Sequence, residues 1–367
     1  MSWALYNKTV WIFKHNTIDS LIKKDKLLCF DLDNTIINTK SKCKFPKNAD
    51  DWEFINDSKE KIINDSKDNI IVIFSNQLKM TTENKINEIK TKIQNIIKEL
   101  NISIFVFIST NNDNYRKPFI GMFELLLNEI YFINIKQFKE IKYIGDAAGR
   151  KDDFSCSDRK FAYNISLYYN KEVLFYTPEE YFLNEDPQNF NWNDINFEEY
   201  KNNKPINLII PEQQEIILFV GFPGVGKTTF YNNYLKKFKY FHINQDELNT
   251  LTKCINLTKT ELNLGKSVVI DNTNPSIETR QKYIKIAKNN KVSIRCIYFD
   301  IDEKLAKHLN KYRMLEYNKQ LVPDISYNVY KKKFTMPSIE EGFDEVIIYN
   351  FILNENNINK QFFYMKF

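Results

Sequence analysis

The stretch Leu218–Leu235, LFVGFPGVGKTTFYNNYL, holds three of the eight glycines of this 367-residue chain. From Gly221 to Thr228 it fits the pattern G-x-x-x-x-G-K-[ST]. An apolar run, EIILFV, precedes the glycines, and a helical run, TTFYNNYLKKF, follows them. In a strand–loop–helix unit of this kind, backbone N–H groups turn towards phosphate oxygens at the positive end of the helix. The stretch therefore predicts a nucleoside triphosphate site in an α/β domain.

Polar residues of this motif and of two later strand ends predict a kinase site. Lys227 is expected to reach the β- and γ-phosphates, and the Thr228 hydroxyl to ligate Mg²⁺. Asp246, after the strand-like run YFHI, is the predicted base that accepts the proton of an acceptor hydroxyl. Asp271, after SVVI, is expected either to orient Mg²⁺ or, with Asn272, to contact the acceptor. The predicted ATP-binding residues are Gly221, Gly224, Gly226, Lys227, Thr228, Thr229 and Arg313, and the predicted substrate-binding residues are Asp271, Asn272 and Arg280.

Two carboxylates, Asp31 and Asp33, follow the apolar run KLLCF in the first half of the chain. Asp31 is a candidate nucleophile that attacks a phosphorus atom and forms an aspartyl-phosphate. Asp33 is a candidate acid and base that protonates the leaving alcohol and then deprotonates water. Later segments supply predicted phosphate-binding residues (Ser75, Asn76 and Arg116), a catalytic cation (Lys117) and further carboxylates (Asp146 and Asp153). The predicted metal ligands are Asp31, Asp33, Asp146, Asp153 and Thr228.

The composition excludes several classes of protein. No apolar run is long enough to span a membrane, and the N-terminus has no apolar core of a secretion signal. The five cysteines are scattered without a CxxC pair, which favours a reducing compartment and argues against structural zinc. Only three histidines are present, which argues against a His-based metal centre and leaves a carboxylate-bound Mg²⁺ open. The net charge of +5 permits an anionic partner.

Apolar runs alternate with helical stretches along both halves, which predicts an α/β protein with two doubly wound parallel-sheet domains. For example, apolar residues spaced by three and four predict a helix over TENKINEIKTKIQNIIKEL. The stretch Leu183–Gln214 has no such period and is rich in Asn, Asp and Pro. We therefore place the first domain at residues 1–185, an interdomain connection at 186–212 and the second domain at 213–367.

The residues of the first half resemble the motifs of the haloacid dehalogenase superfamily of phosphotransferases. The DxDx[TV] pattern matches Asp31 to Thr35, with Asn34 where glycine is usual; asparagine tolerates left-handed backbone angles. More specifically, a series of segments resembles the bifunctional polynucleotide kinase/3′-phosphatases of eukaryotic DNA repair. These segments are DLDNTIINTKS, YRKPFIGMFE, GDAAGR, DFSCSDRKFA, FYTPEEYF, GFPGVGKTTF, DNTNP and MPSIEEGF, in this order.

This resemblance implies a haloacid dehalogenase-like 3′-phosphatase followed by a P-loop 5′-kinase. It implies Mg²⁺ and ATP as cofactor and phosphoryl donor, and nucleic acid, most simply DNA strand breaks, as the partner. It further implies a monomer without membrane attachment, in the nucleus, or in the cytoplasm for a viral or parasite member. The short stretch before Lys26 leads us to expect no forkhead-associated domain and hence no recruitment to phosphopeptide scaffolds.

Three other interpretations remain open on the sequence. One is a small-molecule kinase joined to a small-molecule phosphatase, which no lone motif excludes. A second is repair of RNA ends in place of DNA ends. A third is a nucleotide-dependent scaffold with decayed sites, against which the intact Asp31, Lys117 and Lys227 argue.

Overall fold

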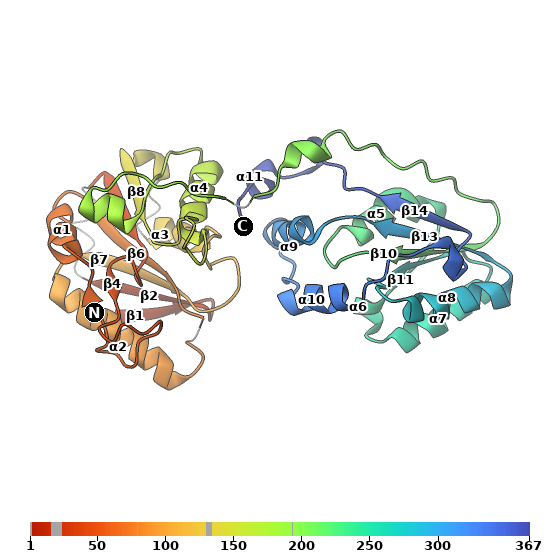
Figure 1. The fold of residues 1–367 in the computed structure, drawn as a ribbon, viewed down its shortest axis with the longest axis horizontal. Coiled ribbons are helices and arrows are strands. Elements are labelled where there is room, and N and C mark those ends of the chain that lie inside the picture. Colours follow the sequence, from red (N-terminus) through yellow and green to blue (C-terminus); the bar gives the residue numbers. More distant parts are fainter. Residues whose placement is uncertain (1, 16–23, 79, 130–133, 193) are drawn as a thin grey trace. The chain divides into compact units, whose positions relative to one another are not determined.

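The computed structural model describes residues 2–15, 24–78, 80–129, 134–192 and 194–367. They form two compact units, each considered by itself. The first unit is Met1–Asp194 together with Tyr364–Phe367, and the second unit is Ile195–Phe363. Both have strands and helices that alternate along the chain (Figure 1). None of the helices in the described residues combines the length and apolar character that crossing a membrane requires.

The first unit is built on a seven-stranded sheet in the order β1-β2-β7-β6-β3-β8-β9. The strands are β1 (Ser2–Tyr6), β2 (Val10–His15), β3 (Lys26–Phe30), β6 (Ile70–Asn76), β7 (Ile104–Ser109), β8 (Glu140–Ile144) and β9 (Leu174–Tyr176), beside a small pair of β4 (Ile37–Asn38) and β5 (Glu53–Phe54). The helices are α1 (Ser58–Asp65), α2 (Glu83–Leu100), α3 (Gly121–Glu129) and α4 (Ser157–Tyr169). The strands from β7 to β9 in this order pair in parallel, so their carboxyl ends meet along one edge.

Helices cover both faces of this sheet, which explains why the central strands read as continuous apolar runs. Successive residues of β6 point to opposite faces. Ile73 belongs to the core cluster that includes α1 and α2 residues. Phe74 contacts Phe123 of α3 and Phe161 of α4, with ring centroids 6.2 and 5.4 Å away. The polar residues that follow such buried strands are therefore held on rigid supports.

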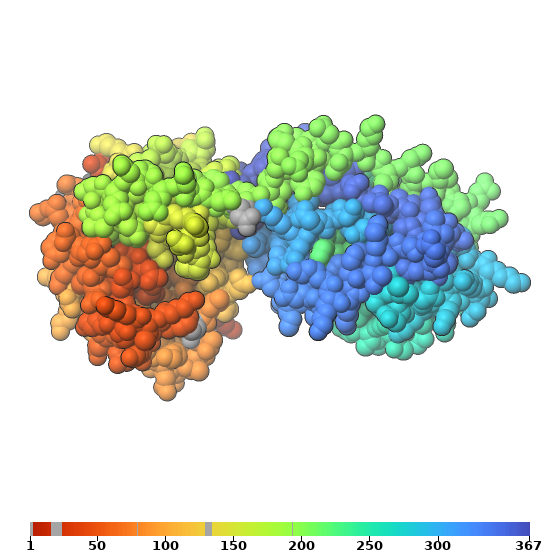
Figure 2. All heavy atoms as spheres, in the orientation of Figure 1, coloured from red at the N-terminus to blue at the C-terminus, as the bar shows by residue number. Residues whose placement is uncertain are grey.

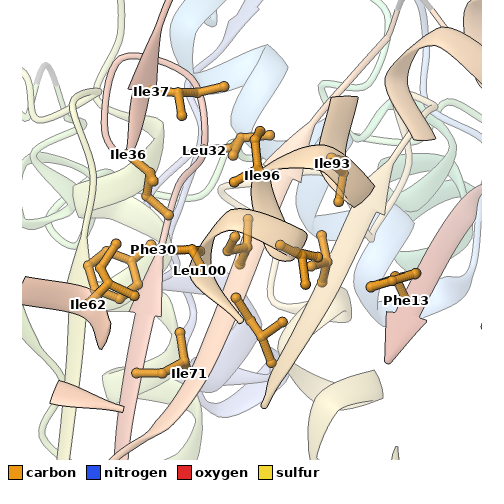
Figure 3. Packing of buried hydrophobic residues seen from close by; sticks show 14 of the residues in the cluster. Phe13, Phe30, Leu32, Ile36, Ile37, Ile62, Ile71, Ile93, Ile96 and Leu100 are labelled. Carbon is orange, nitrogen blue, oxygen red and sulfur yellow. The ribbon is translucent and has the colours of Figure 1, made fainter. Parts of the chain in front are cut away.

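Helix α2 shows how the sequence directs this packing. Thr82 caps its first turn by accepting a hydrogen bond from the Lys85 N–H, and Asn101 ends it in a left-handed conformation. Ile93, Ile96, Ile97 and Leu100 are buried in one cluster, and Ile86 and Ile89 pack against it half-buried. Figure 3 shows Ile93, Ile96 and Leu100 gathered with Phe30 and Ile71 of the sheet. The helix predicted from the spacing of three and four is confirmed.

The second unit has a five-stranded parallel sheet in the order β11-β12-β10-β13-β14. Its strands are β10 (Glu215–Val220), β11 (Phe241–Asn244), β12 (Val268–Asp271), β13 (Ser293–Phe299) and β14 (Glu345–Tyr349). Its helices are α5 (Lys227–Phe230), α6 (Gln245–Leu248), α7 (Leu251–Asn263), α8 (Ile277–Asn290), α9 (Glu303–Tyr317), α10 (Asp324–Lys333) and α11 (Lys360–Phe363). Two core clusters lie on the two faces of β10, with Leu218 in one and Phe219 in the other.

Some elements of the fold differ from the sequence-based expectation. The antiparallel hairpin of β1 and β2 was not predicted, so the first sheet is mixed and not wholly parallel. The boundary between the units lies at Asp194 and Ile195, inside the connection expected at 186–212. The exposed stretch 183–190 runs along the surface of the first unit (Figure 2). The last four residues, placed with the second domain by the sequence, belong to the first unit.

The core of the first unit gives a prediction for its stability. Replacing the buried Ile96 by alanine should lower the free energy of unfolding by about 2–5 kcal/mol, because it removes apolar contacts and leaves a cavity. Ile89→Ala, on the same helix but half-buried, should cost clearly less. Urea unfolding of the first unit in both variants measures the difference, and equal losses would contradict this assignment of the core face.

Candidate active sites

The first site is a cluster of charges at the carboxyl ends of β3 and β8. Asp31 directly follows β3, and its backbone N–H donates to the carbonyl oxygen of Ile144 at the end of β8. The buried Lys117 ammonium lies 2.5 Å from Asp31 Oδ1 and 2.7 Å from Asp158 Oδ1. The Tyr143 hydroxyl lies 2.9 Å from the same ammonium and donates to Asp158 at 3.0 Å. Asp31 and Lys117, both assigned to this site from the sequence, are therefore in direct contact.

Three carboxylates of this cluster have the chemistry of a divalent-cation site. Asp31, Asp146 and Asp158 each offer an oxygen, and these oxygens lie within 4.8 Å of one another. Burial, followed by repulsion from Asp158, raises the pKa of Asp146 to about 7. Burial likewise raises the pKa of Asp31, and the charges of Asp158 and Asp146 add to this while Lys117 opposes it. One ammonium does not neutralise three carboxylates, so a hard cation fits this place.

Lys117 is held in its charged form by its neighbours. Burial disfavours the ammonium, but the carboxylates of Asp158 and Asp31 outweigh it and raise the pKa of Lys117. The side-chain amide of Asn76 accepts a hydrogen bond from the Lys117 N–H at 3.0 Å and donates one to the Lys117 carbonyl oxygen at 3.1 Å. Asn76, predicted to bind phosphate, is therefore a residue that positions Lys117.

Gly145 allows Asp158 to enter the cluster. A Cβ atom at position 145 would lie 2.6 Å from the side chain of Asp158. The Asp158 carboxylate also accepts a hydrogen bond from the Ala147 N–H at 3.1 Å. The glycine of the GDAAGR segment thus serves a close approach between a strand end and the first turn of α4.

Asp153 lies elsewhere, which corrects the predicted pairing of Asp146 and Asp153 at a metal. Its carboxylate accepts hydrogen bonds from the N–H groups of Ala148 and Arg150 and forms an ion pair with the Arg150 guanidinium at 3.0 Å. Asp153 therefore shapes the loop, and Asp158 takes its place in the carboxylate cluster. Asp158 was not predicted, because the sequence DFSCSD does not reveal which of its two aspartates the start of α4 turns inward.

Asp33 has partners that the sequence did not reveal. Its two carboxylate oxygens accept hydrogen bonds from Lys92 at 2.9 Å and from Gln77 at 2.6 Å. Its side chain is not one of the three that form the carboxylate group, although it was predicted as a metal ligand. Asn34 between the two aspartates adopts a φ of 59°, the left-handed conformation expected for it.

Ser75 and Arg116 border this site. Ser75 Oγ accepts a hydrogen bond from Gln77 at 2.9 Å, which leaves its own hydrogen for another acceptor. Arg116 precedes Lys117, and its buried Nη1 has no hydrogen-bond partner in the described structure. Unpaired guanidinium donors of this kind suit an anion. Both residues keep the phosphate-binding role predicted for them as a hypothesis.

The second site lies at the carboxyl end of β10. Gly224 and Gly226 have φ angles of 81° and 90°, which side chains rarely adopt, so the loop requires glycine there. The Lys227 ammonium curls back to the carbonyl oxygens of Gly221 and Phe222, at 3.2 and 2.6 Å. Burial lowers the pKa of Lys227 to about 8. The negative charge of a bound triphosphate would favour the charged form of Lys227 and so oppose the effect of burial on its pKa.

Asp271 faces the threonine of the phosphate loop. The Thr228 hydroxyl donates to Asp271 Oδ2 at 2.6 Å, and His242 Nε2 lies 2.9 Å from the same oxygen. The His242 ring in turn stacks on Tyr231, with centroids 4.2 Å apart. Of the two roles left open for Asp271, orienting a cation beside Thr228 fits this geometry. His242 is a residue that the sequence reasoning missed.

Asn272 positions the predicted base. Its Oδ1 accepts a hydrogen bond from the Gln245 N–H at 2.7 Å, at the first residue of α6. The next residue is Asp246, whose N–H is capped by Asn244 at 2.8 Å. Asp246 is exposed and lines the same cavity as Lys227 and Thr228.

This cavity has a volume of about 1170 Å³ and is large enough for a nucleotide and part of an acceptor. Thr229 and Arg313, both predicted to bind ATP, line it with the phosphate loop. Aromatic and apolar side chains complete the wall; they include Tyr312, Tyr317, Val329, Tyr330, Tyr349 and Phe351.

Arg280 does not line this cavity, which corrects its predicted contact with the acceptor. It is fully buried and pairs with Glu341, with contacts of 2.8 and 2.5 Å. Its remaining guanidinium nitrogen donates to the carbonyl oxygens of Asn274 and Pro275. Because all three nitrogens are engaged, Arg280 ties the segment before α8 to the segment before β14.

Comparison with known proteins agrees with this two-site architecture. The family described as polynucleotide kinase 3 phosphatase matches residues 26–182, and an AAA domain family matches residues 216–337. A bifunctional polynucleotide phosphatase/kinase of Schizosaccharomyces pombe is 36% identical over 94% of this chain and 84% of its own length. The chain belongs to the bifunctional polynucleotide phosphatase/kinase family.

Two other relatives show how this family varies. A putative bifunctional polynucleotide phosphatase/kinase of Acanthamoeba polyphaga mimivirus is 33% identical over 91% of this chain and 86% of its own length. A polynucleotide 3′-phosphatase of Saccharomyces cerevisiae is 33% identical over 42% of this chain and 85% of its own length. The phosphatase/kinase family thus has relatives that share only part of this chain.

The carboxylate cluster gives a prediction that separates Asp158 from Asp153. Asp158→Asn should weaken binding of Mn²⁺ by about tenfold or more, because it removes a charge from a cluster of three carboxylates. Asp153→Asn should leave the affinity within about twofold, since its charge is neutralised by Arg150. Calorimetric titration of both variants with Mn²⁺ measures this, and the reverse order of affinities would return Asp153 to the site.

Proposed function

We propose that this protein heals broken polynucleotide ends, by removing a 3′-phosphate in the first unit and phosphorylating a 5′-hydroxyl in the second. The observation that carries the proposal is the contact of Asp31 with Lys117 in a chain that also bears a complete phosphate loop. The first arrangement suits a carboxylate nucleophile for phosphate, and the second suits the transfer of a phosphoryl group from ATP. DNA is the proposed substrate, in keeping with the resemblance of both halves to DNA repair enzymes.

In the first site, Asp31 attacks the phosphorus of the 3′-phosphate, and the bond from phosphorus to the 3′-oxygen breaks. Asp33 gives a proton to that oxygen, then takes one from the water that hydrolyses the aspartyl-phosphate. Gln77 and Lys92 hold the Asp33 carboxylate in place between these steps. Lys117, Ser75 and Arg116 hold the phosphoryl oxygens.

In the second site, Asp246 accepts the proton of the 5′-hydroxyl while its oxygen attacks the γ-phosphorus of ATP. The bond from the γ-phosphorus to the bridging oxygen breaks, and ADP leaves. Lys227 and the backbone N–H groups of the loop stabilise the charge that develops on the phosphate oxygens. Arg313, on α9, adds a second cation at the wall of the cavity.

Mg²⁺ is the cation that we assign to both sites, because their donors are hard oxygens. Asp31, Asp146 and Asp158 would hold it in the first site, and Thr228 with Asp271 in the second. When bound, it neutralises phosphate charge at the reacting group.

One incubation tests the whole proposal against its alternatives. A nicked DNA duplex with a 3′-phosphate and a 5′-hydroxyl is incubated with the protein, ATP and Mg²⁺, and both ends are analysed on a denaturing gel. Parallel reactions contain the matching RNA, or free nucleosides and nucleoside 3′-monophosphates. Faster turnover of the free nucleosides than of the oligonucleotide would favour the small-molecule interpretation.

Separate substitutions should abolish the two activities independently. Asp31→Asn should lower the 3′-phosphatase kcat by several decades and leave the 5′-kinase unchanged, because it removes the nucleophile of the first site alone. Lys227→Ala should have the opposite effect, because the ammonium binds the triphosphate. The same nicked substrate reports both activities. Residual phosphatase turnover in Asp31→Asn above about a tenth of wild type would rule out covalent catalysis at this residue.

Asp246→Asn tests the assignment of the base in the kinase site. The amide keeps the size of the carboxylate but cannot accept a proton, so kcat should fall by about a hundredfold or more. The affinity for ATP should change little, because the phosphate loop holds the nucleotide. Single-turnover kinetics at saturating ATP measure the chemical step. An intact transfer rate with a raised KM for the oligonucleotide would make Asp246 a substrate anchor, and Asp271 the next candidate.

A further inference from the structure

The last four residues of the chain, Tyr364–Phe367, pack with the first unit, although the residues before them form the second unit. The C-terminus marked in Figure 1 lies beside helix α4. Met365 is only 1% exposed, so this C-terminal tail (residues 364–367) is docked and not loose. Its contacts fall on α4, on Phe119, and on Trp192 and Asp194.

Asn164 of α4 is the central anchor of the tail. Its side chain accepts a hydrogen bond from the Lys366 N–H at 2.7 Å and donates to the Lys366 carbonyl oxygen at 2.9 Å. The same amide nitrogen donates to the carbonyl oxygen of Pro118, also at 2.9 Å. Asn164 is fully buried, so leaving these bonds unmade would be costly. One side chain thus joins the tail to the residue after Lys117.

Other side chains of the tail strengthen this contact. The Phe367 ring packs on the buried Phe119 ring with centroids 5.0 Å apart, and Lys160 of α4 donates to the Phe367 carbonyl oxygen at 2.8 Å. The Lys366 ammonium pairs with Asp194 and lies 4.4 Å from the centre of the Trp192 ring. The tail therefore holds its place through polar, ionic and aromatic contacts together.

The two anchored segments are those that supply the charges of the first active site. Phe119 follows Lys117 by two residues, and Asn164 lies on the helix that begins beside Asp158. The ion pairs of Lys117 with Asp158 and Asp31 depend on the spacing of these segments. Active sites tolerate displacements of only about 0.5 Å before catalysis suffers.

We propose that the C-terminal tail is a positioning element of the phosphatase site. Its Phe367 ring packs on Phe119 and its backbone bonds Asn164 and Lys160 of α4, so it braces the segment after Lys117 against α4 and keeps the Lys117 ammonium at Asp31. This inference rests on the proposed phosphatase function. It means that residues 364–367, which follow the second unit in sequence, serve catalysis in the first unit.

The full-length variant Phe367→Ala tests this proposal, with both activities measured on the same sample. The 3′-phosphatase kcat should fall about tenfold or more, because a displacement of about 1 Å can cost that much, while its KM stays within about twofold. The 5′-kinase should keep its wild-type rate. Phe367→Tyr, which retains the ring, should restore phosphatase turnover. Phe238→Ala, which truncates an exposed phenylalanine of the second unit, is the matched control and should leave both activities unchanged.

A second variant and a stability measurement distinguish a selective loss of phosphatase activity from a loss of folded protein. Asn164→Ala removes the polar link to Pro118 and should show the same selective loss of phosphatase kcat. Thermal unfolding identifies any variant that lost activity by unfolding, and a parallel loss of folded protein and both activities overturns the positioning role. Wild-type phosphatase kcat in both variants, or an effect on KM alone, also overturns it. If the wild-type protein itself releases no phosphate from the 3′-end, the proposed function has failed, and the inference falls with it.

Discussion

The burial of the Lys117 ammonium is the constraint on which the first active site depends. A buried ammonium is stable only when opposite charges accompany it, and removing one partner of such a pair typically costs about 3–5 kcal/mol. Asp31 and Asp158 supply these charges, and they come from a strand end and from the start of a helix far apart in sequence. The parallel sheet, the glycine at position 145 and the first turn of α4 all serve to bring these groups together. The site is therefore formed by the fold and not by any one motif.

The excess of carboxylates around Lys117 links the stability of this unit to the binding of a cation. The two carboxylates of Asp31 and Asp158 already outnumber the single ammonium of Lys117, and a third carboxylate, Asp146, lies beside them. Burial, followed by repulsion from Asp158, raises the pKa of Asp146 to about 7. Such an arrangement is unfavourable by itself and becomes favourable when a cation binds. Hydrogen bonds to neighbouring residues hold the carboxylate-bearing segments in place despite the repulsion between like charges. The Asp146 N–H, for example, donates to the Thr35 hydroxyl at 3.0 Å.

The order of strands and helices could be predicted well, because it is encoded in local periodicity. KLLCF and EIILFV are strands with the predicted bounds, and the residues that follow them belong to the two sites. What could not be predicted came from packing between distant segments. Lys92 looks like a solvated helix residue in the sequence, yet it is buried beside Asp33. Arg280 looks like a free cation, yet Glu341 neutralises it. Likewise, only the folded chain shows that Asp158 turns inward while Asp153 binds Arg150.

The two catalytic lysines show how the source of the countercharge shapes each site. Burial disfavours the ammonium in both places, and Lys117 and Lys227 are almost equally inaccessible, at 3% and 7% exposed. Yet the pKa of Lys117 is raised, because the carboxylates of Asp158 and Asp31 outweigh burial. Burial lowers the pKa of Lys227 to about 8, and the charges of Asp271 and Asp246 oppose this only in part. In the first site the countercharge belongs to the protein, so the ammonium is paired with Asp31 and Asp158 without any ligand. In the second site the ammonium contacts carbonyl oxygens, and the carboxylates of Asp271 and Asp246 act on it more weakly than burial does, so a bound triphosphate would favour the charged form. The phosphate loop thus owes part of its expected affinity for a nucleotide to the negative charge that the phosphates bring to a buried lysine.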